Sequence, residues 1–535
     1  MENGAKIISI DPRYHDTAAT VADEWIPIYP STDTAMMVAM AYVMVKENLY
    51  DQKFLDKYTV GFDKFRDYVM GEEDGIKKTP QWASKISGVP AQTIERIARL
   101  YATTQPAALM DCQGPARSAM GEQYNRCAST LCAMTGNVGR PGGSAGGGLM
   151  GIPIGHMFRM SAIPPGKNPV EADGPRVKGT LDIRLRVAKR VHINKLFDAI
   201  LKGKSGGYPA EIKMMWSMCN NYINQTGNSN KADKALKQLD FLVVNELFMT
   251  ATARYADIVL PVTTAAERSD LTRPWPSGPY FTHVNRAIEP LGECKSDLDI
   301  AAEIAERLGI KDFRPFTEDE LLKMFVENNP ETGPLIPDYE KFKKEGIHRV
   351  DLPEPIVAFS DQIKDLENHP FETPSGKIEI FSQRVEDMNH PLCPSIPKYM
   401  EVPEDRNDPL VKKYPLQLLT PHPKNRVHSE LYKVEWLSEI EPHQAWINAD
   451  DAQKRGVSDG DQIHVFNDRG TVTIKAWVTQ RIKPGVISIF EGAWYTPDKD
   501  GIDQGACANT LTRDAYSGGG AAVMNTTLVE VKGVK

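Results

Sequence analysis

The sequence lacks most of the short patterns that identify a common class of site. Its seven cysteines are scattered and none forms a C-x-x-C pair, so no iron–sulfur cluster made by this chain alone is predicted, and we expect small buried thiols. It contains no Walker A sequence and no H-E-x-x-H motif. No apolar run reaches the roughly 20 residues of a membrane-spanning helix. The 63 basic and 71 acidic residues leave a net charge of −8, which gives no support for nucleic-acid binding.

What the sequence does contain begins with an α/β pattern. Residues 6–10 form a buried-type strand that ends at Asp11-Pro12-Arg13, and residues 25–30 are a second extended segment. In doubly wound α/β folds, ligands lie at the carboxyl ends of the strands. There Asp11 can accept hydrogen bonds from a ribose or a guanine edge, and Arg13 can reach a phosphate.

Three further segments of this first region carry signals. Ser31-Thr32-Asp33 predicts the N-cap of a helix whose methionine stripe packs in the core, so Thr32 and Asp33 are either capping residues or ligand-binding residues. We predict a helix over 93–103, a strand over 107–110, and a loop at 112–118 that opens the next helix. The Gly-rich loop at 135–143 permits close approach of a ligand, but it does not follow the G-x-G-x-x-G fingerprint.

The middle region begins irregularly. Residues 146–207 show little periodicity and predict a long irregular connection. Strands at 212–216, 241–245 and 255–261, with a helix at 232–239, predict a βαβ unit and a parallel sheet. Further helices are expected at 297–308 and within 317–372, and residues 401–413 form a polar linker.

The C-terminal region alternates apolar and polar residues with the period of short strands. Residues 462–466 and 471–478 flank the turn Asn467–Gly470, which predicts a β-hairpin, and residues 450–455 predict a short helix stopped by Gly456. Strands at this spacing predict a small closed β-barrel. The fold class is therefore α/β: doubly wound α/β layers followed by a C-terminal double-psi-like β-barrel. We divide the chain into 1–150 (an α/β dinucleotide-binding domain), 151–405 (a second α/β domain) and 406–535 (the barrel).

Several motifs carry a resemblance to a known family. The barrel loop reads HPKNRVHS at 422–429, EGAWY follows at 491–495, and an N-x-L-T motif occupies 509–512. With these motifs the chain resembles the molybdopterin-dinucleotide oxidoreductases of the dimethyl sulfoxide reductase family along nearly its whole length. The resemblance implies a bis(molybdopterin guanine dinucleotide) cofactor with molybdenum, and places an iron–sulfur cluster only in an N-terminal region before Met1 or in a partner subunit.

The resemblance also implies site residues. Arg117, in the loop after Gly114, matches a position near the metal pocket and is the expected catalytic residue; no metal ligand is expected in this chain, because the family's metal-ligating serine matches no residue after Met1. The residues expected to bind the cofactor are Asp11, Arg13, Thr32, Asp33, Gly114, Arg117, Asn221, Glu246, His422, Arg426, His428, Ser429 and Asn509. Single histidines usually have structural roles, whereas two histidines and an arginine within seven positions favour cofactor binding.

The expected activity is the reduction of an S-oxide or N-oxide by oxygen-atom transfer. The resemblance implies partners as well: the missing N-terminal segment, an iron–sulfur electron-transfer subunit and a membrane-anchor subunit, at the periplasmic face of the cytoplasmic membrane in anaerobic respiration. Ala116 and Ser118 replace the family's usual Gln and His, which leaves the substrate open. The alternatives are a related molybdenum or tungsten enzyme acting on sulfur, selenium or arsenic oxyanions or on formate, or a non-catalytic fragment that only binds pterin dinucleotide.

Overall fold

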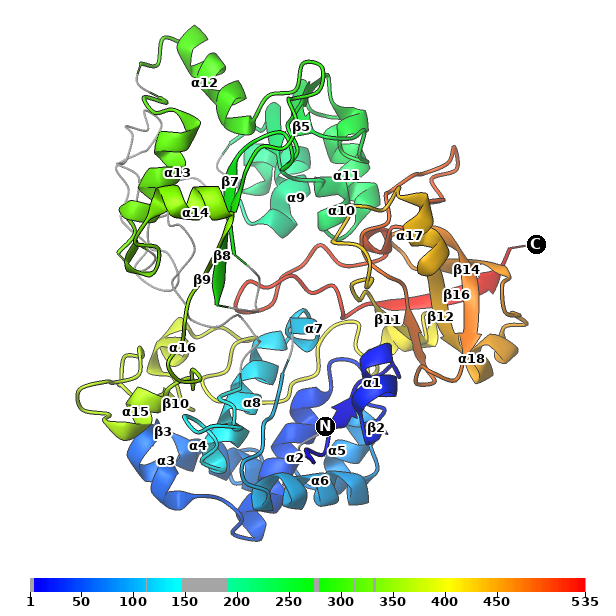
Figure 1. The fold of residues 1–535 in the computed structure, drawn as a ribbon. Coiled ribbons are helices and arrows are strands. Elements are labelled where there is room, and N and C mark those ends of the chain that lie inside the picture. Colours follow the sequence, from blue (N-terminus) through cyan, green and yellow to red (C-terminus); the bar gives the residue numbers. More distant parts are fainter. Residues whose placement is uncertain are drawn as a thin grey trace. The chain divides into compact units, whose positions relative to one another are not determined.

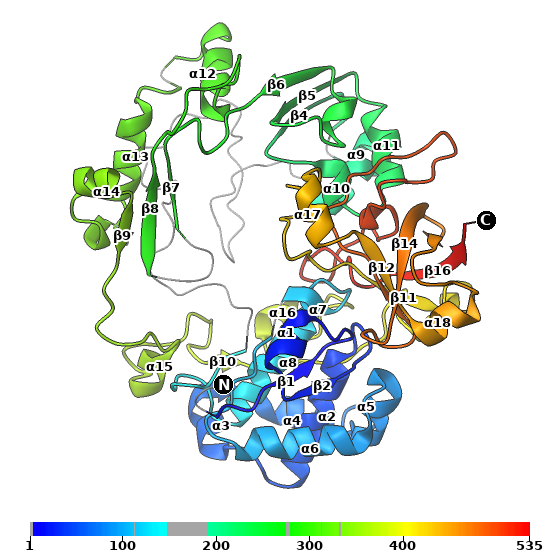
Figure 2. The same cartoon turned by 45° about the vertical axis from the view of Figure 1, so that its right-hand side comes forward.

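The computed structural model describes residues 4–111, 113–146, 191–208, 210–273, 279–311, 313–330 and 333–534. The chain divides into two compact units (Figures 1 and 2). The first unit consists of Met1–Leu149, Tyr222–Ala232 and Val357–Lys535, and the second of Met150–Asn221 and Asp233–Ile356. Each unit is described by itself below.

The first unit begins with a small β-α-β arrangement. Strand β1 (Ile8–Ile10) pairs in parallel with β2 (Glu24–Ile26), and α1 (Asp16–Val21) connects them. Helix α2 (Asp33–Lys46) follows and is buried from Thr34 to Met44. A helix that is apolar on every side must be covered on every side, and α2 packs against α4 (Phe62–Met70), α5 (Pro80–Ser87), α6 (Ala91–Thr103) and α8 (Gly121–Met134). The methionine stripe thus lies in the core, as predicted.

One local expectation for this region holds in position, and one is wrong. Thr32 stands at the N-cap of α2 as predicted, but its hydroxyl donates to the Tyr29 carbonyl oxygen at 2.7 Å and makes no side-chain cap. Residues 107–110 form no strand, because side chains satisfy their backbone instead: Ala107 N donates to Asn137 Oδ1, and Leu109 N donates to Ser144 Oγ. The predicted Gly-rich loop is present, and its glycines at 136, 139 and 142 have positive φ angles.

The C-terminal part of the first unit is a closed six-stranded barrel, as predicted. Its order is β11-β15-β12-β14-β13-β16, and the strands are β11 (Leu416–Leu419), β12 (Gln444–Asn448), β13 (Gln462–Phe466), β14 (Thr471–Thr479), β15 (Val486–Ser488) and β16 (Leu528–Gly533). The expected hairpin is the antiparallel pair β13–β14, and the expected short helix is α18 (Ala449–Lys454). Closure removes the exposed sheet edges, and leucine, isoleucine, valine and alanine side chains fill the interior.

Shorter elements complete the first unit. Strand β3 (Thr59–Val60) pairs in parallel with β10 (Ile378–Glu379), which joins segments more than 300 residues apart. The remaining helices are α3 (Gln52–Tyr58), α7 (Gln113–Ala116), α10 (Tyr222–Gln225), α15 (Ser360–Lys364), α16 (Gln383–Met388) and α17 (Glu435–Ile440). Among the described residues, no helix has the length and apolar character needed to cross a membrane.

The second unit contains two sheets. As predicted, β4 (Met214–Met218), β5 (Phe241–Glu246) and β6 (Ile258–Pro261) form a parallel sheet, and α11 (Ser229–Leu236) lies in the β4–β5 connection. An antiparallel sheet of β7 (Asp270–Thr272), β8 (Tyr280–Val284) and β9 (Ile347–Arg349) was not predicted. Helices α12 (Asp297–Arg307), α13 (Glu318–Glu327) and α14 (Tyr339–Glu345) belong to the same unit. The expected irregular connection falls mostly at 147–190, outside the described residues, but α9 (Leu196–Lys202) occupies its last part.

Candidate functional site

The loop after β1 is anchored on the barrel. Tyr14 N donates to the Arg481 carbonyl oxygen at 2.8 Å, and Lys483 N donates to the Pro12 carbonyl oxygen at 2.9 Å. The guanidinium of Arg13 lies 5.2 Å from the ring centroid of Trp446 in β12. This loop therefore presents its charged residues beside the barrel, although the two segments are about 470 residues apart in sequence.

Asp11 and Arg13 form one charged pair in this loop. The Arg13 amide donates to Asp11 Oδ1 at 2.7 Å. Burial raises the pKa of Asp11, while the charge of Arg13 opposes that rise; burial also lowers the pKa of Arg13, and the charges of Asp11 and Asp16 oppose that change. Opposite charges held together in a desolvated position are suited to a ligand that carries both hydrogen-bond donors and an anionic group.

Asp33 begins α2 in an unusual electrostatic environment. Desolvation raises its pKa to about 7, a hydrogen bond from its own amide opposes the rise, and the negative charge of Asp11 adds to it. The preceding Ser31 has a left-handed backbone with φ = 64°, a conformation that is uncommon outside glycine and is often found at ligand-binding positions. The turn 31–33 thus combines backbone strain at Ser31 with a carboxyl group whose pKa is raised by burial.

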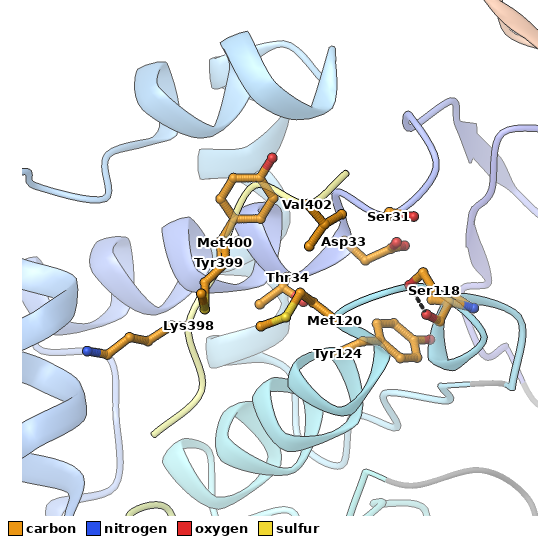
Figure 3. Close-up of a pocket in the computed structure, with 11 residues that line it drawn as sticks. Ser31, Asp33, Thr34, Ser118, Met120, Tyr124, Lys398, Tyr399, Met400 and Val402 are labelled. Atoms are coloured by element: carbon orange, nitrogen blue, oxygen red, sulfur yellow. Dashed lines mark hydrogen bonds between the residues drawn. The ribbon is translucent and has the colours of Figure 1, made fainter. Parts of the chain in front are cut away.

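A small, partly open pocket lies beside this turn. Its lining includes Ser31 and Asp33, Ser118 and Tyr124 from the loop before α8 and from α8 itself, and the segment 398–402 (Figure 3). Figure 3 shows Asp33 and Ser118 on the same side of the pocket. The turn 31–33 and the Arg117 loop, which the sequence assigns to the same cofactor, therefore lie at one site in the first unit.

Arg117 follows α7 in this loop, and its charge acts on the barrel loop. The positive charge of Arg117 opposes protonation of His422, which places the two residues within electrostatic reach. The carbonyl oxygens of Gly114 and Arg117 accept hydrogen bonds from Asn525, the first from its side chain at 2.9 Å and the second from its backbone at 3.0 Å. The expected catalytic residue is therefore held against the C-terminal segment of the barrel.

His422 and His428 converge on a carboxylate that the sequence analysis did not select. The Nδ1 atoms of both imidazoles lie near Glu491 Oε1, at 2.7 Å from His422 and at 2.9 Å from His428. The hydrogen bond to Glu491 raises the pKa of His422 against the effects of burial and of Arg117. Burial raises the pKa of Glu491, but both histidines outweigh it and lower that pKa. The EGAWY motif contained this residue, so the signal was available.

The same three side chains have the spacing of a metal site, since their ligand atoms lie within 4.8 Å of one another. Both imidazoles use Nδ1 toward Glu491, however, and both side chains are otherwise exposed. Imidazoles that carry a proton on each nitrogen donate hydrogen bonds to an anion, whereas metal binding requires a deprotonated nitrogen. Because Glu491 favours the protonated state of His422, the arrangement suits an anionic group better than a cation.

Arg426 and Ser429 belong to the same barrel loop. Arg426 is 5% exposed, and its Nη2 donates to the Glu441 carbonyl oxygen at 2.8 Å and to Ser438 Oγ at 3.3 Å. Its buried Nε has no hydrogen-bond partner among the described residues. A buried unsatisfied donor is costly, and an anionic oxygen of a bound group would satisfy it. The Ser429 carbonyl oxygen accepts from Trp494 Nε1 at 2.8 Å, which ties the loop to EGAWY.

The remaining predicted site residues lie elsewhere. Asn509 is buried, and its amide donates to the Asn224 carbonyl oxygen at 2.6 Å and accepts from Thr512 Oγ1 at 2.6 Å, so it fixes the segment 222–230 against the barrel. Asn221 and Glu246 belong to the second unit. The side-chain oxygen of Asn221 accepts from the amide and hydroxyl of Thr252, whereas Glu246 stands at the carboxyl end of β5.

The first unit thus brings together the polar residues of four loops: Asp11 and Arg13, Thr32 and Asp33, Gly114 and Arg117, and the segment from His422 to Ser429. The donors that this set supplies are guanidinium and imidazole groups, with one orphaned guanidinium nitrogen. These groups fit a cofactor with phosphate groups and a hydrogen-bonding heterocycle. The sequence predicted cofactor-binding residues in all four loops but did not indicate Glu491, which contacts both histidines of the barrel loop, or Asn525, which contacts three of the loops.

Comparisons with known proteins agree on one family. A family model described as molybdopterin oxidoreductase matches residues 1–307, and one described as molydopterin dinucleotide binding domain matches residues 416–526. The chain is 39% identical to a dimethyl sulfoxide reductase of Haemophilus influenzae over 95% of this chain and 66% of that protein. It is 38% identical to a dimethyl sulfoxide reductase of Escherichia coli over 96% of this chain and 65% of that protein.

Two further matches widen the comparison. A trimethylamine-N-oxide reductase of Haemophilus influenzae is 34% identical over 96% of this chain and 65% of that protein. Among solved structures, an acetylene hydratase from Pelobacter acetylenicus matches with a TM-score of 0.74 at 22% identity, over 99% of this chain and 74% of that chain; this likeness concerns the fold alone. The chain spans about two thirds of the length of the dimethyl sulfoxide reductases that it matches.

Proposed function

Because the chain belongs to the molybdopterin oxidoreductase family, we propose that its first unit holds a molybdopterin guanine dinucleotide with molybdenum, in an enzyme that reduces an S-oxide or an N-oxide. The bound group would supply the two-electron oxygen-atom transfer, which protein side chains cannot perform alone. The sequence relatives named as dimethyl sulfoxide and trimethylamine-N-oxide reductases support this substrate class. The chain's own residues bind the cofactor, orient it and set the charge around it.

The observation that carries the proposal is that the Arg117 loop and the His422–His428 loop supply hydrogen-bond donors to the same site, where the carboxylate of Glu491 supports the two histidines. Glu491 holds both imidazoles by Nδ1, and it favours the protonated state of His422, in which Nε2 can donate to a phosphate oxygen. Arg426 adds a buried Nε that has no partner among the described residues. Arg13 and Arg117 add positive charge, and Asp33 can accept hydrogen bonds from a heterocycle. Preorganised donors of this kind hold an anionic group at little further cost.

Arg117 is the proposed catalytic residue. As a permanently charged donor it can hydrogen-bond to the oxygen of a polarised S=O or N–O group, which carries a partial negative charge in the bound substrate.

Asn221 and Glu246 are proposed to bind the cofactor as well; Glu246 stands at the carboxyl end of a parallel strand, the position at which ligands bind in such sheets. Asn509 is proposed to support the cofactor loops through the segment 222–230.

Partners and location belong to the same proposal. We propose that electrons arrive from an iron–sulfur subunit bound to a membrane anchor, at the periplasmic face of the cytoplasmic membrane. The matched relatives are about half as long again as this chain, and we propose activity only for the protein in its full-length context. Activity is therefore best tested with this chain in its full-length context.

The experiment measures cofactor and activity on the same preparation. Molybdenum is determined by elemental analysis, and guanine nucleotide is measured as GMP released by acid hydrolysis. Two GMP per molybdenum, together with reduction of dimethyl sulfoxide or trimethylamine N-oxide by a reduced viologen dye, is the expected result. Arg117→Lys should lower kcat by at least tenfold at unchanged GMP content, whereas Arg286→Lys, on the surface of the second unit, should change neither. Protein with no molybdenum and no GMP would overturn the proposal.

A further inference from the structure

Asn525 lies between the barrel core and the candidate site, in the segment that precedes β16, and it connects three separate loops. Its Oδ1 accepts hydrogen bonds from Thr420 N at 3.1 Å and from Thr420 Oγ1 at 3.3 Å. Its Nδ2 donates to the Gly114 carbonyl oxygen at 2.9 Å, and its backbone N donates to the Arg117 carbonyl oxygen at 3.0 Å. Its carbonyl oxygen accepts from Ser31 Oγ at 3.4 Å.

We propose that Asn525 is a positioning residue that fixes the spacing of the Arg117 loop, the His422 loop and the turn at Ser31, and so prepares them to receive the pterin dinucleotide. This inference rests on the proposed function. Thr420 lies two residues before His422, Gly114 and Arg117 delimit the catalytic loop, and Ser31 lies two residues before Asp33. Through its side chain and its backbone, Asn525 thus contacts three of the four loops of the first unit that carry predicted cofactor-binding residues. The exception is the loop of Asp11 and Arg13.

The orientation of the Asn525 amide follows from its partners. Thr420 N can only donate and the Gly114 carbonyl can only accept, so a single orientation of the carboxamide satisfies both. Aspartate has the same shape but would lack the donor and would place a negative charge against the Gly114 carbonyl oxygen. Only a carboxamide can therefore join these two loops, and asparagine is the residue whose reach fits.

The neighbouring Thr526 extends the same junction. Its hydroxyl accepts from Ala119 N at 2.9 Å and lies 3.5 Å from Ser31 Oγ. Thr526 is 2% exposed. The turn at Ser31 has a left-handed backbone, so a fixed partner there holds a conformation that the chain alone disfavours. Residues 525–526 therefore position the turn at Ser31 and the Arg117 loop relative to each other, and Ser31, Pro115 and Ser118 of those two segments line the pocket that contains Asp33.

The test compares Asn525→Ala and Asn525→Asp with a matched control, Asn467→Asp. Asn467 makes three bonds of the same types inside the barrel turn: its Nδ2 donates to the carbonyl oxygens of Leu511 and Leu528, and its Oδ1 accepts from Arg469 N. Hydrogen exchange of the cofactor-free protein is measured by mass spectrometry on peptides covering 113–119 and 420–430. Thermal stability and GMP content of protein loaded with cofactor are measured on the same variants.

Asn525→Ala should speed exchange in both peptides, and Asn525→Asp should speed it chiefly in 113–119, because aspartate keeps the acceptor for Thr420. Loaded protein should retain the dinucleotide more weakly in both variants: about fivefold in Asn525→Asp, which loses one hydrogen bond, and more in Asn525→Ala, which loses three. Asn467→Asp should lower the melting temperature but should change neither hydrogen exchange in the two peptides nor retention of the dinucleotide.

Two outcomes would overturn the inference. The first is unchanged hydrogen exchange in both peptides of the Asn525 variants. The second is that Asn467→Asp, at the same loss of thermal stability as the Asn525 variants, loses as much dinucleotide as they do. A wild-type protein that carries no guanine nucleotide would overturn the proposed function instead. The exchange measurements do not require cofactor, so they decide the role of Asn525 in either case.

Discussion

Glu491 favours the protonated state of His422. Its hydrogen bond is the largest of the effects on His422 and raises the pKa of that imidazole, whereas burial and the charge of Arg117 lower it. Glu491→Gln removes the negative charge and leaves at most a neutral acceptor for His422 Nδ1, so burial and the charge of Arg117 then outweigh it. We therefore expect the pKa of His422 to fall below its ordinary value of about 6.5, as measured from the imidazole proton shifts by NMR titration. His464 in β13, whose pKa burial and Lys532 lower, is the internal control and should not move.

The same substitution has a stability consequence with a defined pH window. The pKa of His422 is raised in the folded state, so its stabilising contribution is complete below about pH 6.5 and is lost as the pH rises through the folded pKa. The pKa of Glu491 is lowered, so its contribution is present above about pH 4.5 and is lost as the pH falls through the folded pKa. Glu491→Gln should therefore lower the melting temperature most between about pH 4.5 and 6.5; a loss that peaked above pH 8 would contradict the pairing.

Asp33 should behave in the opposite way. Its pKa is raised to about 7 by desolvation, so the folded protein binds more protons than the unfolded chain between about pH 4 and 7, and stability falls as the pH rises through that range. One pKa unit corresponds to about 1.4 kcal/mol, which limits the cost to about 4 kcal/mol, and the dipole of α2 offsets part of it. Asp33→Asn should stabilise the cofactor-free protein by roughly 1–2 kcal/mol at pH 8 and by almost nothing at pH 4.

Denaturant unfolding at the two pH values measures this effect. Asp408→Asn is the matched control, because hydrogen bonds from the amides of Glu404 and Leu410 lower the pKa of Asp408. That variant should lose stability at pH 8. Stabilisation of both variants would show that the effect of Asp33→Asn reflects net charge and not the desolvation of one carboxyl group.

At the scale of an element, the barrel loop depends on a glycine that follows Glu491. Gly492 has φ = 92°, and a Cβ on it would lie 1.7 Å from the His428 carbonyl oxygen. Gly492→Ala must therefore displace the backbone of the histidine loop, which we expect to cost more than about 2 kcal/mol and to reduce bound GMP. Gly460→Ala is the control, since Gly460 has φ = 81° with open space around it and should cost only about 1 kcal/mol. An equal loss of unfolding free energy in Gly492→Ala and Gly460→Ala would contradict the predicted clash between a Cβ at position 492 and the His428 carbonyl oxygen.

The elements that sequence could predict are those whose signal is local. The hairpin β13–β14 and the parallel sheet β4–β5–β6 follow from periodicity and turn residues, and both are present. The strand expected at 107–110 fails because Asn137 and Ser144 satisfy its backbone from about 30 residues away. The sheet β7–β8–β9 was missed because its last strand lies about 60 residues after the second. Strand pairing between segments so far apart in the sequence produces no local sequence pattern that predicts it.

The same reason limits the prediction of the site. The HPKNRVHS and EGAWY motifs lie on the barrel and could be found from sequence, but the role of Glu491 depends on a loop 63 residues away. Asn525 lies 411 residues from Gly114 and 494 from Ser31, and nothing in its immediate sequence indicates a contact with either. Sequence therefore identified which loops carry charge, whereas the residues that hold the loops together required the structure.

At the scale of the whole molecule, each unit has its own hydrophobic core. Leu131 of α8 is fully buried in the core of the first unit, and Phe342 of α14 is 2% exposed in the core of the second. Proteins with separate cores depart from all-or-none unfolding, so calorimetry of the cofactor-free protein should show two transitions. Leu131→Ala and Phe342→Ala should each cost about 3–5 kcal/mol, and each should lower one transition and leave the other in place.

Once each transition is assigned to a unit, the effect of cofactor on the two transitions shows which unit contributes most of the binding free energy. A ligand that binds only folded protein stabilises the unit that it contacts by mass action. The four loops that carry most of the predicted cofactor-binding residues belong to the first unit, whereas the predicted residues Asn221 and Glu246 belong to the second. Loading with cofactor should therefore raise chiefly the transition that Leu131→Ala lowers. A rise confined to the transition that Phe342→Ala lowers would mean that the residues gathered around Glu491 and Asn525 are not the main binding surface.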